Sequence, residues 1–412
     1  MEIVKLSATI AGQFIKIKTI VYEKKGFYAL LTLSLGACNT GTAKDATAVN
    51  INDSTKSIST MMPNQQAFTQ TIDSKQTNLY LLKNSNGMQL AITNYGGRFI
   101  YLIAPDKIGN PVNVIVGFDS VQQFKQSTGP YYGATIGRYG NRIAKGKFSL
   151  DGTTYQLSVN NGPNTLHGGK NGFQYKVWDA KQAGDSVLEL SYLSKDGEEG
   201  FPGNLQVKVT YSLTQSNEIK MEYEATTDKK TVINLTSHAF FNLNGAGSGT
   251  INNHLLMINA DNYTPVDATL IPTGKIETVK GTPFDFTTAT KIGNRVNDTA
   301  NIQIKNGAGY DHNFVLNLNK GTGLNLAATA LGDKTGIYME VFTQEPGLQF
   351  YGGNFMQGKN TISGGGKDDF RTAFCLETQH FPDAPNHPSF PTTILLPGKM
   401  YKTVSLYKFS VK

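Results

Sequence analysis

A short stretch near the C-terminus combines a carboxylate with a rigid loop. Glu377 follows an apolar run at residues 372–376 and precedes a segment with two histidines and four prolines. Prolines exclude regular structure in that segment, whereas residues 374–379 read as a strand. Alternation along this strand would place Cys375, Glu377 and Gln379 on one face. A carboxylate placed there is suited to acid–base chemistry; the alternative is an ordinary exposed glutamate.

A loop with two arginines offers donors for substrate oxygen atoms. Arg138 and Arg142 lie four residues apart within residues 136–143, separated by Tyr-Gly and Asn141. Guanidinium groups donate several hydrogen bonds in a fixed plane, which suits the recognition of oxygens. The alternative is that both arginines pair with surface acids.

Two histidines lie in segments where they could contact a ligand. His167 precedes two glycines, which would let the backbone approach a ligand closely; an exposed histidine in a turn is the alternative. His238 lies among apolar and aromatic residues at 234–243, where we expect a strand. Half-burial would keep its imidazole near neutrality and let its neighbours tune the pKa. A histidine satisfied within the core is the alternative.

These segments resemble the motifs of one family, the aldose 1-epimerases or galactose mutarotases. The matches are LETQHFPD followed by NHPSFPTTILLPG, the GR-x-x-NRI and LHGG motifs, NLT-x-H-x-YFNL, GYDHNF and PG-x-QFY. They occur in family order, and the resemblance covers residues 79–412. Several motifs in order are far more specific than any one of them.

The resemblance implies a role for each matching residue. Glu377 and His238 would be the catalytic base and acid. The substrate-binding residues would be Asn141, Arg142, His167, Asp311 and Gln349. Phe240 stands where the family often has tyrosine, which removes one hydroxyl contact.

This set of residues matches the chemistry of anomer interconversion. An aldose changes anomer by opening its ring, rotating about C1–C2 and closing again, which requires one acid and one base but no nucleophile, metal or nicotinamide. We therefore expect a cofactor-free aldose 1-epimerase acting on aldohexoses such as glucose and galactose. A glycosidase would require a second catalytic carboxylate, whereas Asp311 is assigned to binding.

Two alternatives remain. A non-catalytic carbohydrate-binding lipoprotein would need neither Glu377 nor His238. A hexose-6-phosphate epimerase would need further basic residues for the phosphate, and the motif loops hold only Arg138 and Arg142. His380, His387 and Asp383 have no recognised metal-ligand spacing, so we expect no metal site.

Strands and turns must position these residues. Asn86-Gly87 separates runs at 79–82 and 88–92, and Asp151-Gly152 separates runs at 148–150 and 154–157, as in β-hairpins. Further runs lie at 187–193, 205–213, 219–225, 232–235, 255–258, 314–318, 337–342, 348–351 and 404–409.

Many short strands separated by turns indicate an all-β sandwich or barrel. The resemblance implies one large antiparallel β-sandwich of the galactose mutarotase-like type. Helical periodicity is scarce, and we expect only short helical turns, near residues 120–124 and 287–292.

The first 37 residues have the order of an export signal. Lys24 and Lys25 precede an apolar run at 27–35 that is too short to span a membrane, and the run ends in Leu-Gly-Ala before Cys38. This order resembles the lipobox of bacterial lipoproteins, in which the cysteine is lipidated; a plain secretory signal is the alternative. We expect a signal peptide at 1–37, a polar tether at 38–75 and the folded domain at 76–412.

Charge and cysteine content limit the partners. The net charge of +7 lies partly in the first 37 residues and forms no basic cluster, so we expect no nucleic-acid partner. A lipidated Cys38 would leave Cys375 without a disulfide partner, so stability must come from a large core. We expect an exported monomer, anchored by lipid to a membrane, most simply on the periplasmic side of the outer membrane, whose partner is a small aldose.

Overall fold

The computed structural model describes residues 8–10, 13–15, 61–319 and 323–412. The chain divides into two compact units, residues 1–49 and 50–412. In the first unit, β1 (Ala8–Ile10) pairs antiparallel with β2 (Gln13–Ile15). Cys38, the apolar run at 27–35 and the first part of the expected tether lie outside the described residues. In the part of the chain that is described, no helix is both long enough and apolar enough to cross a membrane.

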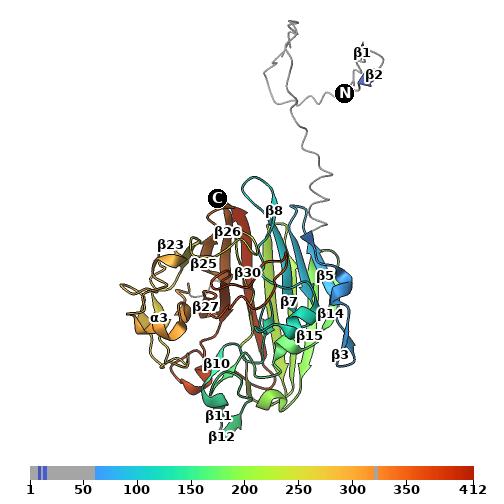
Figure 1. Cartoon of the computed structure of the whole chain (residues 1–412). Coiled ribbons are helices and arrows are strands. Elements are labelled where there is room, and N and C mark those ends of the chain that lie inside the picture. The colour runs from blue at the N-terminus through green and yellow to red at the C-terminus, as the bar shows by residue number, and fades with distance from the viewer. Residues whose placement is uncertain (1–7, 11–12, 16–60, 320–322) are drawn as a thin grey trace, which may run out of the picture. The chain divides into compact units, whose positions relative to one another are not determined.

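The second unit is built around a long antiparallel sheet. Within the described residues, nine strands pair in the order β14-β15-β16-β17-β30-β26-β25-β20-β23 (Figure 1). Their bounds are β14 (Asp179–Ala183), β15 (Val187–Ser194), β16 (Leu205–Leu213), β17 (Glu218–Thr227), β20 (Leu255–Ile258), β23 (Thr290–Lys291), β25 (Asn325–Leu331), β26 (Ile337–Thr343) and β30 (Met400–Val411). Burial alternates along β16 and β17, so one face of the sheet packs against the core and the other faces solvent.

A second sheet carries most of the candidate site. It pairs in the order β22-β21-β24-β27-β28. The bounds are β21 (Asn262–Thr264), β22 (Glu277–Thr278), β24 (Asp311–Val315), β27 (Gly347–Tyr351) and β28 (Cys375–Gln379). Every residue of β27 and β28 is buried, because these strands are covered on both faces.

A third sheet closes the sandwich beside β14 and β15 (Figure 1). It consists of β5 (Leu79–Lys83), β6 (Gln89–Thr93), β7 (Arg98–Pro105) and β8 (Pro111–Asn113) in sequence order. One hydrophobic cluster joins all three sheets and includes Leu90, Val209, Tyr223, Phe350 and Leu376.

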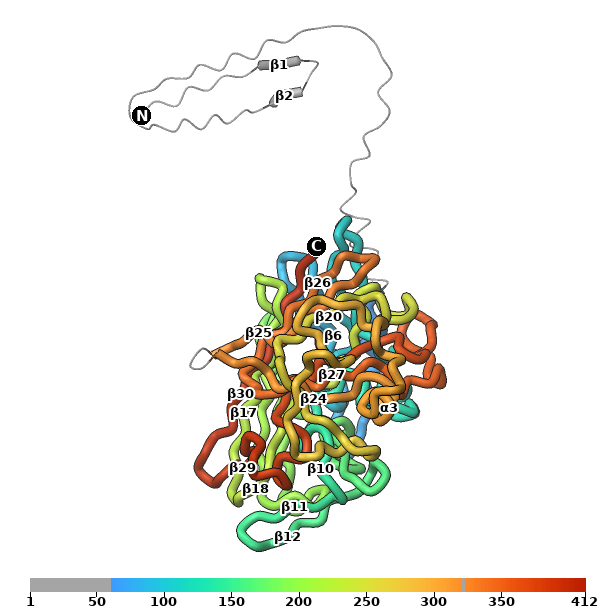
Figure 2. Tube along the Cα trace, turned by 90° about the vertical axis from the view of Figure 1, so that its left-hand side faces the viewer, coloured from blue at the N-terminus to red at the C-terminus, as the bar shows by residue number. Residues whose placement is uncertain are grey.

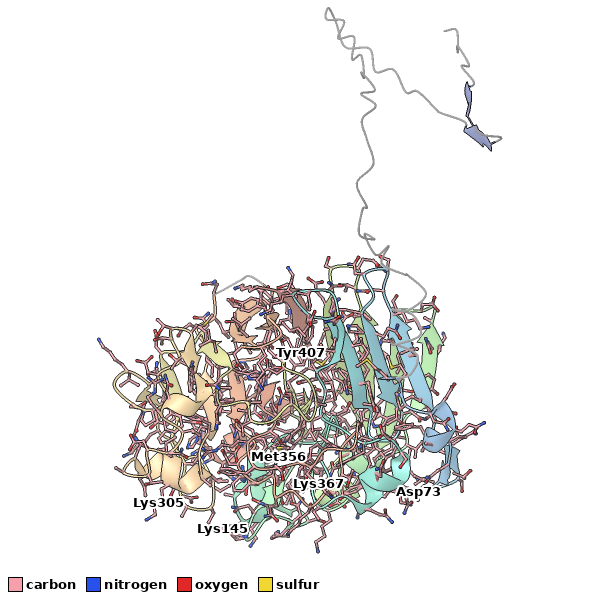
Figure 3. The ribbon with its side chains drawn as sticks, turned by 45° about the horizontal axis from the view of Figure 1, so that its top comes forward. Asp73, Lys145, Lys305, Met356, Lys367 and Tyr407 are labelled. Carbon is pink, nitrogen blue, oxygen red and sulfur yellow. The ribbon has the colours of Figure 1, made fainter. Side chains whose placement is uncertain are left out.

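Tyr407 of β30 links the large sheet to the strand that carries Glu377. Its side chain is buried in the interior (Figure 3), and its hydroxyl donates to the carbonyl oxygen of Leu376 at 2.8 Å. The core therefore supports the backbone of β28 directly from behind.

Short elements complete the fold. The paired strands are β3 (Thr71–Ile72) with β4 (Lys75–Gln76), β9 (Thr135–Ile136) with β19 (Thr236–Ser237), β10 (Arg142–Ile143) with β13 (Thr165–Leu166), β11 (Lys147–Leu150) with β12 (Thr153–Gln156), and β18 (Thr231–Val232) with β29 (Ile394–Leu395). The helices are α2 (Val121–Gln126), α3 (Ile302–Gly307), η1 (Gln65–Phe68), η2 (Ala144–Gly146), η3 (Phe173–Tyr175), η4 (Glu198–Gly200), η5 (Ile292–Asn294) and η6 (Ala384–Asn386). Figure 2 shows β10, β11, β12, β18 and β29 at one end of the domain.

The all-β sandwich expected from the sequence is confirmed, as are both hairpins. β5 pairs with β6 and β11 pairs with β12 in antiparallel register. The helical turn near residue 120 is also confirmed as α2, whose first turn is capped by the Ser120 hydroxyl accepting from the Gln123 amide.

Other local predictions were wrong. The helical turn expected near residues 287–292 lies later in the chain, as η5 (Ile292–Asn294), because Thr290 pairs with Leu256 at the edge of the large sheet. The run at 232–235 is a strand only at its start, since the Asn234 amide donates to the Arg138 carbonyl in a loop. His238 lies just beyond β19, although its amide still bonds to the Ala134 carbonyl.

The folded structure begins before the boundary that we expected at Gln76. Phe68 is buried in a cluster with Tyr101, and its carbonyl oxygen accepts from the Thr77 hydroxyl at 2.6 Å. Residues 61–75 are therefore packed against the domain, because an aromatic side chain in this polar stretch supplies enough apolar surface to hold it.

Candidate active site

An open cavity of about 620 Å³ brings together most of the predicted site residues. Its lining includes Asn141, Arg142, His167, His238, Asp311 and Glu377. Gln349 is not among the lining residues. It lies behind Asp311, where its amide nitrogen donates to Asp311 Oδ1 at 2.7 Å.

Three neighbouring strands place the acidic side of the cavity. In the register of β24, β27 and β28, Asn313, Gln349 and Glu377 lie opposite one another. Gln379 donates to Asn313 at 3.1 Å from the same face of β28 as Glu377. Cys375 contacts His238 from that face too, so the predicted alternation along β28 is confirmed.

Two loops place the basic side of the cavity. Pairing of β10 with β13 sets Arg142 opposite Leu166, which brings Arg142 next to His167. Arg142 Nη1 lies 3.5 Å from Asp311 Oδ2, and its Nε donates to Asn161 Oδ1 at 3.1 Å. The guanidinium is thus held between a carboxylate and an amide.

Glycine is required where these loops meet. Gly168 has φ +83°, and a Cβ there would overlap the carbonyl oxygen of Gly137. The glycine that follows His167 is therefore needed for two reasons. It adopts a positive φ, and it lets the two backbones pack closely.

Glu377 is a buried carboxyl group. Burial raises its pKa well above the usual 4.5; the negative charge of Asp311 raises it further, whereas Arg142 acts in the opposite direction. Oε1 lies 3.6 Å from His238 Nε2. Oε2 is buried and has no hydrogen-bond partner among the described residues, so one oxygen of the carboxyl group is left unsatisfied.

Both cavity histidines are neutral imidazoles near pH 7. Burial lowers the pKa of His238 to about 3, and the positive charges of Arg98 and Arg142 act in the same direction. Burial, then His238, then Arg142 lower the pKa of His167 well below 6.5. His167 Nδ1 accepts from the Asn141 amide at 3.1 Å, so its proton must sit on Nε2.

Aromatic rings form the wall beside the histidines. The Tyr131 ring lies 4.5 Å from His167 and 5.8 Å from His238 between centroids. Phe240 stacks on His238 at 4.9 Å. Tyr131 could not be predicted as a site residue, because one tyrosine beside another in a Gly-Pro stretch carries no distinctive pattern. Phe355 also lines the cavity and is 49% exposed; Met356, labelled in Figure 3, lies beside it in the lining.

His167, His238 and Glu377 have ligand atoms within 4.8 Å of one another, a spacing that could hold a metal ion. The chemistry of the group fits a metal poorly. His167 carries its proton on Nε2, so that nitrogen has no lone pair to offer, and Arg142 adds positive charge close by. The group is better suited to donate hydrogen bonds to an oxygen-rich ligand.

Several other residues lie away from the cavity. Trp178 packs in the core against Phe173. His312 is fully buried and contacts Gln303 at 3.2 Å. Arg138 is a structural residue, since its guanidinium donates to the carbonyl oxygens of Pro202 and Gly203. His380 pairs with Glu345 at 2.5 Å.

Comparisons with known proteins agree with this geometry. A sequence model described as aldose 1-epimerase matches residues 78–408. Galactose mutarotase of Bos taurus is 41% identical over 79% of this chain and 92% of its own length. Aldose 1-epimerase of Escherichia coli is 37% identical over 82% of this chain and 96% of its own length.

A solved structure shares the fold. The aldose epimerase homologue from C. elegans superposes with a TM-score of 0.75 at 29% identity, covering 81% of this chain and 99% of that one. The family match spans the cavity and nearly the whole second unit. The chain therefore belongs to the aldose 1-epimerase family, whose enzymes interconvert the anomers of aldoses.

Proposed function

We propose that the chain opens and recloses the rings of aldohexoses such as glucose and galactose, with Glu377 and His238 transferring the protons. The observation that carries this proposal is the pair itself. Glu377 Oε1 and His238 Nε2 lie 3.6 Å apart, and both side chains are buried where they line the cavity. One base and one acid beside the same cavity satisfy the requirement of ring opening.

Ring opening moves two protons. Glu377 takes the proton of the C1 hydroxyl while His238 protonates the ring oxygen; the bond between C1 and the ring oxygen breaks, and C1 becomes the aldehyde carbon. Rotation about C1–C2 presents the other aldehyde face to the C5 hydroxyl. Closure returns one proton to His238 and one from Glu377 to the new C1 oxygen, so the pair regains its starting state.

The pair holds one proton between its two members. Burial raises the pKa of Glu377 and lowers the pKa of His238, so in the empty cavity this proton rests on the carboxyl group. Bound sugar must shift it to His238 before Glu377 can act as the base. A C1 hydroxyl that donates to the carboxyl group favours this shift, because it stabilises the carboxylate.

The remaining polar residues suit sugar hydroxyls. Asp311 can accept from hydroxyl groups, and His167 can donate from Nε2. Arg142 is held near both by its contacts with Asp311 and Asn161. We assign Gln349 to fixing the Asp311 carboxylate through their 2.7 Å hydrogen bond, instead of to direct contact with the sugar.

The lining favours a neutral sugar over a sugar phosphate. Arg142 is the single lysine or arginine among the described residues that line the cavity, and it already faces Asp311. A phosphate dianion would need more compensating charge than this side chain supplies.

Polarimetry tests the proposed reaction. Freshly dissolved α-D-glucose and α-D-galactose should reach their equilibrium rotations faster with the protein than without it, and the 6-phosphates should show no comparable acceleration. Acceleration restricted to the 6-phosphates would replace this proposal with the hexose-6-phosphate epimerase. No acceleration for any sugar, together with sugar binding, would favour the binding protein.

We also propose that lipid on Cys38 anchors the exported chain to a membrane, most simply on the periplasmic side of the outer membrane. Support comes from the order of Lys24, Lys25, the apolar run and the Leu-Gly-Ala-Cys sequence. Cys38→Ser should move the protein into the soluble fraction, where size exclusion should give the mass of one chain. A variant as membrane-bound as the wild type would refute the anchor.

A further inference from the structure

The turn that carries His167 is strained. His167, Gly168 and Gly169 have φ values of +50°, +83° and +98°, and this left-handed region disfavours a residue with a side chain as large as histidine. The Gly169 amide donates to the Leu166 carbonyl at 3.1 Å, and the His167 amide donates to the Asn141 carbonyl at 3.0 Å. A strained turn persists only where its surroundings hold it, so further contacts must keep its shape.

One side chain supplies those contacts. Asn160 Oδ1 accepts from the Leu166 amide at 2.7 Å, and Asn160 Nδ2 donates to the carbonyl oxygens of Leu166 and Gly169, each at 3.0 Å. Among the described residues, no other side chain bonds to the backbone of residues 166–169. A single carboxamide therefore fixes the turn on both sides of His167.

The position of the His167 ring depends on this turn. Nδ1 accepts from the Asn141 amide at 3.1 Å, so the N–H group at Nε2 is the one that can donate to a sugar. The Tyr131 ring lies 4.5 Å from the His167 ring between centroids, and the Tyr131 hydroxyl lies 3.4 Å from Asn160 Nδ2. Asn160 thus contacts both the turn that carries His167 and the ring that packs beside it.

We propose that Asn160 is a positioning residue, which holds the turn at residues 166–169 and thereby directs the Nε2–H of His167 toward sugar hydroxyl groups. Asn160 does not line the cavity, so its effect on the sugar must pass through His167. This inference rests on the proposed role of His167 in sugar binding, and it gives a residue outside the cavity a part in the affinity for the sugar.

A double-mutant cycle tests this coupling in the full chain. Calorimetric titration gives Kd for galactose in the wild type, Asn160→Ala, His167→Ala and the variant with both changes, and it does not require turnover. Asn160→Ala should raise Kd by about tenfold, the effect of one lost hydrogen bond. In the His167→Ala background the same change should raise Kd by less than about twofold, since no histidine is left to direct. An unchanged Kd in Asn160→Ala, or an equal effect in both backgrounds, would overturn the proposal.

Asn84 offers a matched control. It is partly buried, like Asn160, and its carboxamide also bonds on both its donor and acceptor sides. Its partners are the Thr214 carbonyl, Asn217 Oδ1 and the amides of Asn86 and Met88, at 2.8–3.1 Å. None of these residues lines the cavity. Asn84→Ala should lower Tm much as Asn160→Ala does but leave Kd unchanged, and an equal rise of Kd in both variants would mean that destabilisation alone weakens binding.

Asn160→Asp tests the donor side of the carboxamide separately. The carboxylate still accepts from the Leu166 amide but cannot donate to the carbonyl oxygens of Leu166 and Gly169, so it should raise Kd as Asn160→Ala does. If Asn160→Ala does not fold, Asn160→Asp takes its place in the cycle. In the wild type, the Leu166 amide should exchange slowly with solvent, and fast exchange would overturn the proposal without any variant.

The outcomes separate this inference from the proposed function. If His167→Ala binds galactose as tightly as the wild type, His167 does not hold the sugar, and its role in the proposed function fails. If His167→Ala weakens binding and Asn160→Ala does not, positioning alone fails. If the coupling is found in a wild type that does not accelerate mutarotation, the proposed reaction fails and the positioning role stands.

Discussion

At the scale of single residues, burial governs the protonation of the catalytic pair. Glu377 and His238 share a cavity in which charge on either is disfavoured, and neither has a charged partner close enough to reverse this effect. The active pair must hold one proton. The pair carries one proton whether that proton rests on the carboxyl group or on the imidazole. The pKa values seen in a pH–rate profile therefore describe the pair and not either residue alone.

The pair therefore predicts a plateau of kcat/KM with two limits. On the acid side, activity should fall only well below pH 6.5, as His238, whose pKa burial lowers to about 3, takes up a second proton. On the alkaline side, it should fall as pH rises through the raised pKa of Glu377, well above 4.5, and the shared proton is lost. Rates measured by polarimetry from acid to alkaline pH, corrected for spontaneous mutarotation, check both limits. An acid limit near 6.5 would mean that His238 is not desolvated.

Asp311 should affect both binding and the titration of Glu377. Asp311→Asn removes a negative charge that raises the pKa of Glu377, so the alkaline limit should move to lower pH. The variant should also raise KM, because a hydroxyl acceptor is lost and Arg142 loses its partner. An unchanged alkaline limit would show that the two carboxylates are not coupled.

At the scale of elements, the site depends on the close approach of two loops. Gly168→Ala should lower activity strongly and destabilise the protein by more than the ~1–2 kcal/mol that a left-handed conformation costs, since its Cβ overlaps the Gly137 carbonyl. Gly152→Ala is the matched control: φ is +80°, close to the +83° of Gly168, but nothing lies within 4 Å. Gly152→Ala should lose only the stability that the left-handed backbone conformation costs, and it should keep full activity. Equal effects of the two changes on activity would contradict the packing argument.

The pairing of His380 with Glu345 joins the start of β27 to the end of β28. Burial acts to lower the pKa of His380, but the Glu345 charge and hydrogen bond outweigh it and raise the pKa. Because the pKa of His380 is raised in the folded protein, the ion pair with Glu345 stabilises the fold fully below pH 6.5. This stabilisation is lost as pH rises through the folded-state pKa of His380. Chemical unfolding at a series of pH values should show this loss in the wild type and not in His380→Gln. The same slope in both proteins would assign it to other groups.

Part of this arrangement could be predicted from the local sequence. Alternation correctly placed Cys375, Glu377 and Gln379 on one face, and Asn86-Gly87 marked a hairpin, because both are set by neighbouring residues. The position of Gln349 behind Asp311 could not be predicted, since it follows from the register between strands that are distant in sequence. The hydrogen bond that fixes the His167 tautomer likewise comes from a separate loop.

At the scale of the whole molecule, two hydrophobic clusters pack around the residues that form the cavity. The large sheet supplies Tyr407 behind β28, and the third sheet adds the cluster that holds Phe68. The family resemblance predicted this sandwich. The polar composition of residues 38–75 led us to expect the fold to begin at Gln76, although Phe68 already packs against it.

Two truncated chains test that boundary. A chain starting at Gln76 should be less stable than one starting at Met61 by at least about 3 kcal/mol, because it loses Phe68, which is 0% exposed. Chemical unfolding of the two chains measures the difference. Equal stability would mean that residues 61–75 contribute no packing.

The most direct test of the account is the mutarotation rate of Glu377→Gln. The amide keeps the shape of the side chain but cannot accept and return a proton, so the rate with glucose and galactose should fall by about 10²–10⁴-fold. Sugar binding, measured by calorimetric titration, should be largely retained, since Asp311, Arg142 and His167 are unchanged. A variant that brings both sugars to equilibrium at the wild-type rate would contradict the acid–base pair.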